Sequence, residues 1–434
     1  MLVNRKFACI YTNLTPCTVA SLSQEAEEYK HLKVVLVNTL YAPTPRMGGA
    51  ELSVQSLAEG ITEAGHQAVV ISTVPQKGIQ IDWVNGVKVY YIGLKNLYWP
   101  YRARKNPVVL KPLWHALDTY NPWMIREGMR ILHEEHPDLV HTNTLAGFSP
   151  KIWQFVKQQG LPLMHTLHDH YLLCPRSSLF RKGQNCRPVC TSCRLFTLPR
   201  SRLSNCVDSV VGVSRYVLDR HLELGYFAST PKKRVIYNGY QAELTARPSE
   251  TGSLPIRFGY LGRLMKDKGI EVLLNSVMQL PEGAWSLEVA GRGQAAYESY
   301  LHTRYNVPAI KFLGYLEPEI FFSKIDILVV PSLIEESFSR VTIEAYAHGV
   351  PVIGSHRGGI PELVEDERTG SLFDPALPSD LSTKMRRYIG KPAIIRRMQS
   401  ACLSKAKAFL LKDNIMQYID AYTDVKAYPT QQVK

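Results

Sequence analysis

The chain of 434 residues is 45% hydrophobic and 21% charged, which is an ordinary globular balance with enough apolar residues for the cores of two domains. Lys and Arg outnumber Asp and Glu by 51 to 38, so the formal net charge is +13. This excess favours an anionic partner, such as a nucleotide, a lipid phosphate, an anionic membrane or a nucleic acid, and charge alone does not choose among them. No apolar run approaches 18 residues, which argues against a transmembrane helix.

The first 31 residues form a predicted N-terminal extension. Arg5 and Lys6 precede a partly apolar stretch, as in a secretory signal. Asn13, Pro16 and several hydroxyl side chains interrupt that stretch, whereas the core of a signal peptide is cleaner. We therefore expect a cytoplasmic protein.

A first domain is predicted over residues 32–247. The apolar run Lys33–Leu40 is typical of a buried parallel strand, and a Pro- and Gly-rich turn follows it. A helical pattern from about Ala50 to Glu63 then leads to a second apolar strand, Gln67–Thr73. Further strands are expected at Val87–Ile92, Leu139–Thr142, Leu163–Leu167, Ser209–Val213 and Arg234–Ile236.

A polar stretch from Arg247 to Pro255 is a predicted linker, after which the alternation resumes in a second domain over residues 255–405. Its expected strands are Ile256–Leu261, Ser286–Ala290, Ile310–Phe312, Ile327–Val330 and Val352–Gly354. The predicted fold is α/β, with two Rossmann-like doubly wound domains facing a cleft and a C-terminal helical segment at 406–434. In such sheets ligands bind beyond the carboxyl ends of the strands.

Two glutamates dominate the most specific stretch of the chain, residues 331–364. Glu336 precedes a predicted helix and Glu344 lies inside it. On one helix they would stand about 12 Å apart, which is too far for the carboxylate pair, about 5–5.5 Å apart, of a retaining glycosidase. Carboxylates near a ligand also accept hydrogen bonds from sugar hydroxyls, and a helix start offers free N–H groups to a phosphate.

The Glu-x7-Glu spacing, the following Gly-Val-Pro-Val and the Gly-Gly-Ile-Pro-Glu at 358–362 resemble the signature of glycosyltransferase family four. The resemblance implies the GT-B fold and retaining transfer from a nucleotide diphosphate sugar. It places Glu336 beside the donor sugar and Glu344 on the ribose diol, with Phe338, Ser339 and Arg340 also at the donor. Ser339 stands where the family commonly has Gly, so a side chain is expected to narrow the loop that faces the donor sugar.

Gly259 to Gly269 is similar to the family's Gly-Arg…Lys-Gly donor motif. Arg263 and Lys268 are thereby implied to neutralise the leaving diphosphate without a metal. Isolated residues of this kind are more often solvated surface charges. The resemblance adds five further donor-binding residues on strand-end loops of the second domain, with the loop Gly314-Tyr-Leu316 at the base through its backbone: Gly262, Gly291, Gly293, Tyr315 and Leu316.

In the first domain, Gly48-Gly-Ala-Glu51 resembles the family's glycine loop before a helix. Gly49 is assigned to the donor and Glu51 to the acceptor, although Glu51 is equally suited to be a first-turn partner of the helix dipole. The resemblance also puts His168 near the donor sugar and the acceptor, with Asp169 on the acceptor side.

A cysteine-rich basic insertion is predicted at 174–206. Two interpretations of its thiols stay open: a structural zinc site, or reduced cysteines without a ligand. The four residues concerned are Cys174, Cys186, Cys190 and Cys193. The segment also holds seven cations and no acidic residue: Arg176, Arg181, Lys182, Arg187, Arg194, Arg200 and Arg202. Together with the aromatic and basic segment 98–105, they suit either an anionic membrane or a plain solvated surface.

The predicted function is therefore transfer of a sugar, as by a hexosyltransferase, from a UDP- or GDP-sugar to a glycan or lipid-linked acceptor in cell-surface polysaccharide or lipopolysaccharide assembly. No cofactor is expected in catalysis, and the enzyme is expected in the cytoplasm or on the inner face of the membrane. The alternatives are an epimerase or phosphorylase of the same fold and a non-catalytic sugar-nucleotide-binding subunit. A nucleic-acid partner has only the charge in its favour, since no binding motif is recognised.

Overall fold

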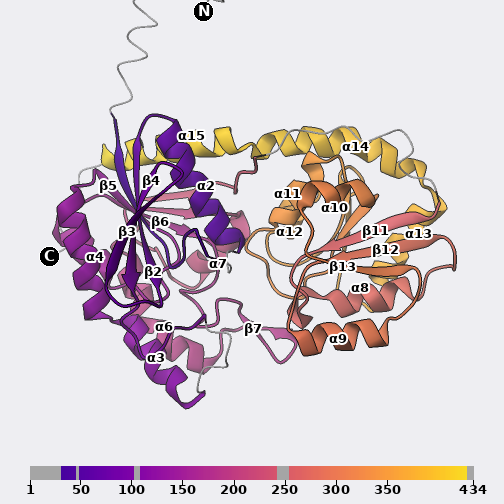
Figure 1. The fold of residues 1–434 in the computed structure, drawn as a ribbon, viewed down its shortest axis with the longest axis horizontal. Helices are drawn as coiled ribbons and strands as arrows, with labels where there is room; N and C mark the ends of the chain where they lie inside the picture. Colours follow the sequence, from indigo (N-terminus) through magenta and orange to yellow (C-terminus); the bar gives the residue numbers. More distant parts are fainter. Residues whose placement is uncertain (1–30, 45–47, 102–107, 242–253, 428–434) are drawn as a thin grey trace, which may run out of the picture.

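A computed structural model describes residues 31–44, 48–101, 108–241 and 254–427. Residues 1–30 of the predicted N-terminal extension, most of the predicted linker, residues 102–105 of the aromatic and basic segment and the last seven residues lie outside this part. Within it, the chain builds two parallel α/β sheets, each with its own helices (Figure 1). The predicted pair of doubly wound sheets is confirmed.

The first sheet has eight strands in the order β10-β9-β6-β5-β1-β2-β4-β3, and its register is parallel except at the β3 edge. The strands are β1 (Lys33–Val37), β2 (Gln67–Val74), β3 (Ile79–Val84), β4 (Val87–Gly93), β5 (Leu139–Thr142), β6 (Leu163–Leu167), β9 (Ser209–Gly212) and β10 (Lys232–Val235). The helices of this half are α2 (Gly49–Glu63), α3 (Lys111–Thr119), α4 (Pro122–Glu135), α5 (Ile152–Gln158), α6 (Thr191–Ser204) and α7 (Arg215–Glu223), with the 3₁₀ turn η1 (Val108–Leu110) before α3.

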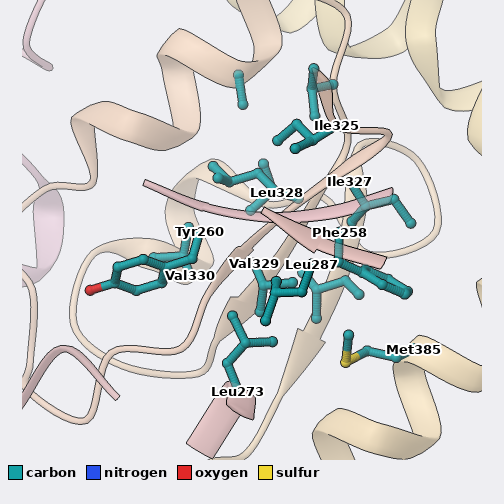
Figure 2. Packing of buried hydrophobic residues seen from close by; sticks show 14 of the residues in the cluster. Phe258, Tyr260, Leu273, Leu287, Ile325, Ile327, Leu328, Val329, Val330 and Met385 are labelled. Atoms are coloured by element: carbon teal, nitrogen blue, oxygen red, sulfur yellow. The ribbon is translucent and has the colours of Figure 1, made fainter. Parts of the chain in front are cut away.

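The second sheet has six parallel strands in the order β13-β12-β11-β14-β15-β16. They are β11 (Ile256–Leu261), β12 (Trp285–Ala290), β13 (Ile310–Gly314), β14 (Ile327–Val330), β15 (Val352–Ser355) and β16 (Gly370–Phe373). The accompanying helices are α8 (Ile270–Val277), α9 (Ala295–Arg304), α10 (Pro318–Lys324), α11 (Arg340–Ala347), α12 (Ile360–Leu363) and α13 (Asp380–Gly390), with the 3₁₀ turn η2 (Lys266–Lys268) before α8. Figure 2 shows the core of this half, where Leu287 and Val329 on the strands face Leu273 of α8 and Met385 of α13, while Leu328 lies on the opposite side of the sheet.

The C-terminal helices bridge the two halves (Figure 1). Helix α14 (Ala393–Ala406) packs on the core of the second sheet, and the chain then crosses through η3 (Lys407–Phe409). Helix α15 (Leu411–Lys426) buries Ile415, Tyr418 and Tyr422 in a core of the first sheet. Among the described residues, no helix has the length and apolarity to cross a bilayer.

Four histidines of the first half are no more than 3% exposed: His141, His165, His170 and His221. Burial lowers the pKa of His141 and His221 to about 3, that of His170 to about 4, and that of His165 well below its ordinary value. All four are therefore neutral in the folded protein at neutral pH, whereas the unfolded chain protonates them below about pH 6.5.

We therefore expect stability to fall as the pH drops from about 6.5 towards 4, because the unfolded state binds more protons in this window. Each buried histidine contributes up to about 1.4 kcal/mol per pH unit to the slope of the unfolding free energy. Urea unfolding at a series of pH values measures it, and His221→Gln is expected to reduce the slope. The matched change at the exposed His133, His133→Gln, is expected to leave it unchanged. A flat profile in the wild-type protein would contradict this account.

Candidate functional site

Two loops of the second half meet at the carboxyl ends of β11 and β14. The Lys268 ammonium lies 2.6 Å from Oε1 of Glu336, and the Ser332 hydroxyl donates to the same oxygen at 2.6 Å. The backbone N–H groups of Leu333 and Ile334 donate to the carbonyl of Asp267 at 2.9 and 3.3 Å. The structure thus brings together the cation and the carboxylate that the two sequence motifs supplied.

Glycine makes this approach sterically feasible. Gly269 has φ +73°, and a side chain there would overlap the carbonyl of Pro331, at the start of the loop that carries Glu336. In the same way, a side chain on Gly291 would overlap the carbonyl of Gly262, and one on Gly293 would overlap Leu264. The absence of side chains at Gly291 and Gly293 thus lets the strand-end loops of β11 and β12 lie in contact.

Arg340, the first residue of α11, reaches from the second half to the first. Its Nη1 donates to the Ser53 hydroxyl of α2 at 2.8 Å, and its Nε lies 3.7 Å from Oε1 of Glu344. A Cβ on Gly49 would stand 3.0 Å from Cδ of Arg340, so the glycine leaves room for this side chain. Burial raises the pKa of the Glu344 carboxyl, and the Arg340 guanidinium opposes that shift.

The predicted acceptor side gathers around Glu51 and Asp169. The Gly48 N–H donates to Oε2 of Glu51 at 2.9 Å, so Glu51 also serves as the first-turn partner of α2. The N–H of Tyr171 donates to Oδ1 of Asp169 at 2.7 Å. Burial, with the negative charge of Glu51 adding to it, raises the pKa of Asp169 to about 6. Burial is the main cause that raises the pKa of the Tyr101 hydroxyl, and the negative charges of Glu51 and Asp169 raise it further.

His168 follows β6 and stands near the same junction. Its Nε2 lies 2.9 Å from Oδ1 of Asn143, while its buried Nδ1 has no hydrogen-bond partner among the described residues. Burial lowers the pKa of His168 to about 4, and the positive charge of Arg340 contributes to this shift. His168 is therefore a neutral imidazole beside the contact between α2 and α11.

Other predicted donor residues are placed differently from this group. Phe338 packs in an aromatic cluster, with ring centroids 6.1 Å from Tyr237 and 6.3 Å from Phe409. The Ser339 hydroxyl is buried and accepts a hydrogen bond from the Thr342 hydroxyl at 2.8 Å. The hydroxyl thus bonds within the start of its own helix, and the expected narrowing of the donor loop stays a prediction.

Three predicted residues stand at the surface or near it. Arg263 is exposed, although its backbone carbonyl accepts a hydrogen bond from the Tyr260 hydroxyl at 2.7 Å. Tyr315 is exposed after β13, and Leu316 beside it is half-buried. Arg263 and Tyr315 are therefore exposed to solvent.

A small hairpin of the insertion, β7 (Phe180–Arg181) with β8 (Gln184–Asn185), leads into a second contact between the halves. The Asn185 amide donates to the carbonyl of Leu333 at 2.8 Å and accepts from the N–H of Glu335 at 3.2 Å. Arg187 forms an ion pair with Glu335 at 3.1 Å. A pocket of about 380 Å³ opens here, lined among others by Arg357. The hairpin thus holds the loop that carries Glu336.

Glu362, the last residue of the Gly-Gly-Ile-Pro-Glu motif, makes a third contact between the halves. Its carboxylate accepts the N–H groups of Arg215 and Tyr216 at 2.8 and 2.7 Å, at the start of α7 in the first half. The Tyr237 hydroxyl also donates to it at 3.0 Å. A carboxylate at a helix start is favoured by the unpaired N–H groups and the helix dipole.

Comparison with known proteins identifies the architecture. Residues 255–391 match the family described as "Glycosyl transferases group 1", and residues 47–244 match "Glycosyltransferase Family 4". An "Uncharacterized 42.6 kDa protein in cps region" from Klebsiella pneumoniae is 35% identical over 338 residues, which are 76% of this chain and 87% of that protein. The chain belongs to the group 1, or family 4, glycosyltransferases. Members of this family are retaining and generally metal-independent.

Solved structures agree with this glycosyltransferase fold. The sucrose-phosphate synthase of Thermosynechococcus elongatus superimposes with a TM-score of 0.72 at 20% identity, over 91% of this chain and 99% of that one. Anabaena HepE in complex with UDP-glucose has a TM-score of 0.63 at 21% identity, over 90% and 100% of the two chains. These structures confirm the predicted GT-B fold, and the family matches confirm the assignment as a glycosyltransferase.

The geometry of the cysteine cluster in this glycosyltransferase bears on the two interpretations of its thiols, a zinc site or reduced cysteines. The sulfur atoms of Cys174 and Cys193 lie 3.7 Å apart, and Cys174 is buried in the core of the first half. Hydrogen bonding, first from the Ser192 hydroxyl, lowers the pKa of Cys190 to about 7. In the described part of the chain, no group of three or more His, Cys, Asp or Glu side chains is arranged to hold a metal ion. The described residues therefore show no assembled four-thiolate zinc site, and the zinc interpretation stays a prediction.

Two of the seven cations in the basic insertion form ion pairs with carboxylates of this glycosyltransferase. Arg200 is fully buried and pairs with Asp118 at 3.2 Å, while Arg187 pairs with Glu335. Both serve contacts within the protein. The exposed remainder is Arg176, Arg181, Lys182, Arg194 and Arg202.

Proposed function

We propose that this glycosyltransferase transfers a sugar, with retention of configuration, from a uridine diphosphate sugar to a glycan or lipid-linked acceptor during assembly of a cell-surface polysaccharide. A GDP-sugar is the second candidate donor. The observation that carries the proposal is the convergence of the family motifs where the two halves touch: the Lys268–Glu336 pair, the Arg340–Glu344 pair and the glycine loop of α2.

The chemistry of this junction supports a positional and electrostatic mechanism. Lys268 supplies a cation for the departing diphosphate, with Arg263 on a neighbouring loop as the second. Glu336 lies at the sugar, and Glu344 accepts from the ribose hydroxyls. The half-buried surroundings of Glu336 and Lys268 strengthen such contacts relative to bulk water. The acceptor hydroxyl enters from the side of Glu51, Asp169 and His168, and the leaving phosphate takes its proton.

Two comparisons support the choice of donor and pathway. HepE, which shares the fold, was solved in complex with UDP-glucose. The relative from Klebsiella pneumoniae is described as lying in a cps (capsule) region. A neutral His168 is consistent with a contact to uncharged sugar hydroxyls. Cytoplasmic placement, with the nucleotide sugar drawn from the cytosol, completes the proposal.

Thermal stabilisation by nucleotides tests the donor. UDP and UDP-sugars are expected to raise the melting temperature by several degrees. A ligand at about 100 times its Kd stabilises the folded state by about 2.7 kcal/mol. GDP and ADP serve as controls for the base. Stabilisation by a guanosine nucleotide alone would move the assignment to GDP-sugars. Absence of any nucleotide effect, and of turnover with the matching sugar donors, would refute the proposed donor site.

A further inference from the structure

Helices α3 and α6 lie side by side at one end of the first half, on the far side of its sheet from α15 (Figure 1). The Thr119 hydroxyl donates to the carbonyl of Phe196 at 3.4 Å, and the rings of His115 and Phe196 lie 6.1 Å apart. Between the helices, the buried Arg200 pairs with the buried Asp118. The two helices therefore present one combined surface.

The outward side of this surface is unusually apolar. Leu195 and Leu198 of α6 are 73% and 62% exposed, and they share a helix face because they stand three residues apart. Leu113 of α3 is 60% exposed, and Val109 of the preceding η1 turn is 85% exposed. Single exposed apolar residues are common, but several on contacting elements form a patch that usually marks a binding surface.

Charge narrows the kind of partner. Asp118 is the only acidic residue in α3 and α6, and it is buried. Three cations on these helices are exposed: Lys111, Arg194 and Arg202. Arg194, Leu198 and Arg202 follow one another at four-residue spacing, so cations flank the apolar side chains on one helix face. Such a face complements a partner with a negative surface above an apolar interior.

The start of α4 extends the same end of the molecule with aromatic rings. Tyr120 follows α3 directly and Trp123 lies in the first turn of α4, and they are 51% and 55% exposed. Amphipathic rings of this kind are favoured at the boundary between lipid headgroups and acyl chains. Apolar side chains, cations and aromatic rings together match the composition of a surface that lies on a bilayer.

We propose that the outward face of η1, α3, α6 and the start of α4 docks this glycosyltransferase onto an anionic lipid bilayer. The inference deepens the proposed function and rests on it in one respect, since a lipid-linked acceptor brings the enzyme to a membrane. Leu195, Leu198 and Leu113 enter the headgroup region, while Lys111, Arg194 and Arg202 contact lipid phosphates.

Sedimentation of the full chain with vesicles tests the proposal. The wild-type protein is expected to bind vesicles of phosphatidylcholine with phosphatidylglycerol, to bind pure phosphatidylcholine weakly, and to dissociate as salt is raised. The exposed pairs allow two variants, Leu195→Ser with Leu198→Ser and Arg194→Ser with Arg202→Ser. Each is expected to weaken binding to the anionic vesicles about tenfold or more.

Matched controls lie on the second half. Leu377 is 58% exposed, and Arg396 and Arg397 are exposed on α14, so Leu377→Ser and Arg396→Ser with Arg397→Ser remove similar groups elsewhere. These variants are expected to bind vesicles like the wild-type protein. Nucleotide stabilisation, measured on every variant, is expected to be unchanged and reports separately on the fold and on the proposed donor site.

Several outcomes would overturn the docking surface. These are patch variants that sediment like the wild-type protein, equal binding to neutral and anionic vesicles, or control variants that lose binding as strongly. A concentration-dependent dimer that only the patch variants abolish, without vesicle binding, would assign the surface to a second copy of the chain instead. Loss of nucleotide effects with intact vesicle binding would refute the proposed donor and leave the docking surface standing.

Discussion

Replacing Lys268 by alanine is expected to lower the rate of sugar transfer on the order of 100- to 1000-fold, which is typical for removing one group that stabilises developing charge. Lys268 forms a 2.6 Å ion pair with Glu336 at the ends of β11 and β14, where the proposed diphosphate departs. The pair is partly exposed, so its loss costs little stability and the variant should stay folded. Steady-state turnover with the donor found by nucleotide screening measures the effect, and far-ultraviolet circular dichroism checks the fold.

Lys266 offers the matched control. It is exposed two residues earlier and lies over the ring of Tyr297, so Lys266→Ala removes a similar charge with little expected effect on turnover. Glu336→Gln and the double variant Lys268→Ala with Glu336→Gln complete a double-mutant cycle. Strong coupling between the two changes is expected, because the groups touch. Near-normal turnover of Lys268→Ala would contradict the assignment of the site.

The change Arg200→Met is expected to lower the free energy of unfolding of the first half by about 3–5 kcal/mol, because it leaves a buried carboxylate without its counter-charge. Arg200 and Asp118 are both fully buried and lie 3.2 Å apart. The guanidinium also donates to the carbonyl of Tyr171 at 2.7 Å and lies 4.2 Å from its ring. Urea unfolding measures the loss, and the melting temperature is expected to fall by roughly 10 °C.

Arg202→Met is the matched control on the same helix, since this side chain is exposed and has no such burial. It is expected to change stability by less than about 0.5 kcal/mol. The double variant Arg200→Met with Asp118→Leu removes both charges and is expected to recover part of the lost stability. A loss of stability equal in Arg202→Met and Arg200→Met would show that the ion pair contributes nothing specific.

Much of the fold followed from the sequence because the central strands are mostly apolar runs. Ile256–Leu261 and Ile327–Val330 were predicted at the bounds that the structure has. Such strands are buried on both faces, so apolar residues dominate them, and the one charge within Ile256–Leu261, Arg257, pairs with Asp326. The edge strand β3 was missed, since its residues are mostly exposed. The Asn85-Gly86 turn before β4, with φ of 48° and 81°, was the available signal.

The candidate site was predictable only where a local motif names the residue. Lys268 and Glu336 sit 68 residues apart, and the motifs placed both at strand ends. Asn185, Glu335 and Tyr101 gave no comparable signal, because their roles come from contacts with distant segments. A cation count likewise could not separate the buried Arg200 from the exposed Arg202, since burial depends on how α3 meets α6.

Helix α15 belongs to the first half in space although it follows the second in sequence. Ile415 fills the space left by Gly60 of α2, and the Tyr422 hydroxyl lies 2.8 Å from the imidazole of His141. The second half, which carries most of the proposed donor site, is thus an insertion between two parts of one folding unit. Transplanting a new donor specificity into this scaffold therefore requires two crossover points, one before β11 and one between η3 and α15. A single splice before β11 would exchange this helix as well and put its contacts with Gly60 and His141 at risk.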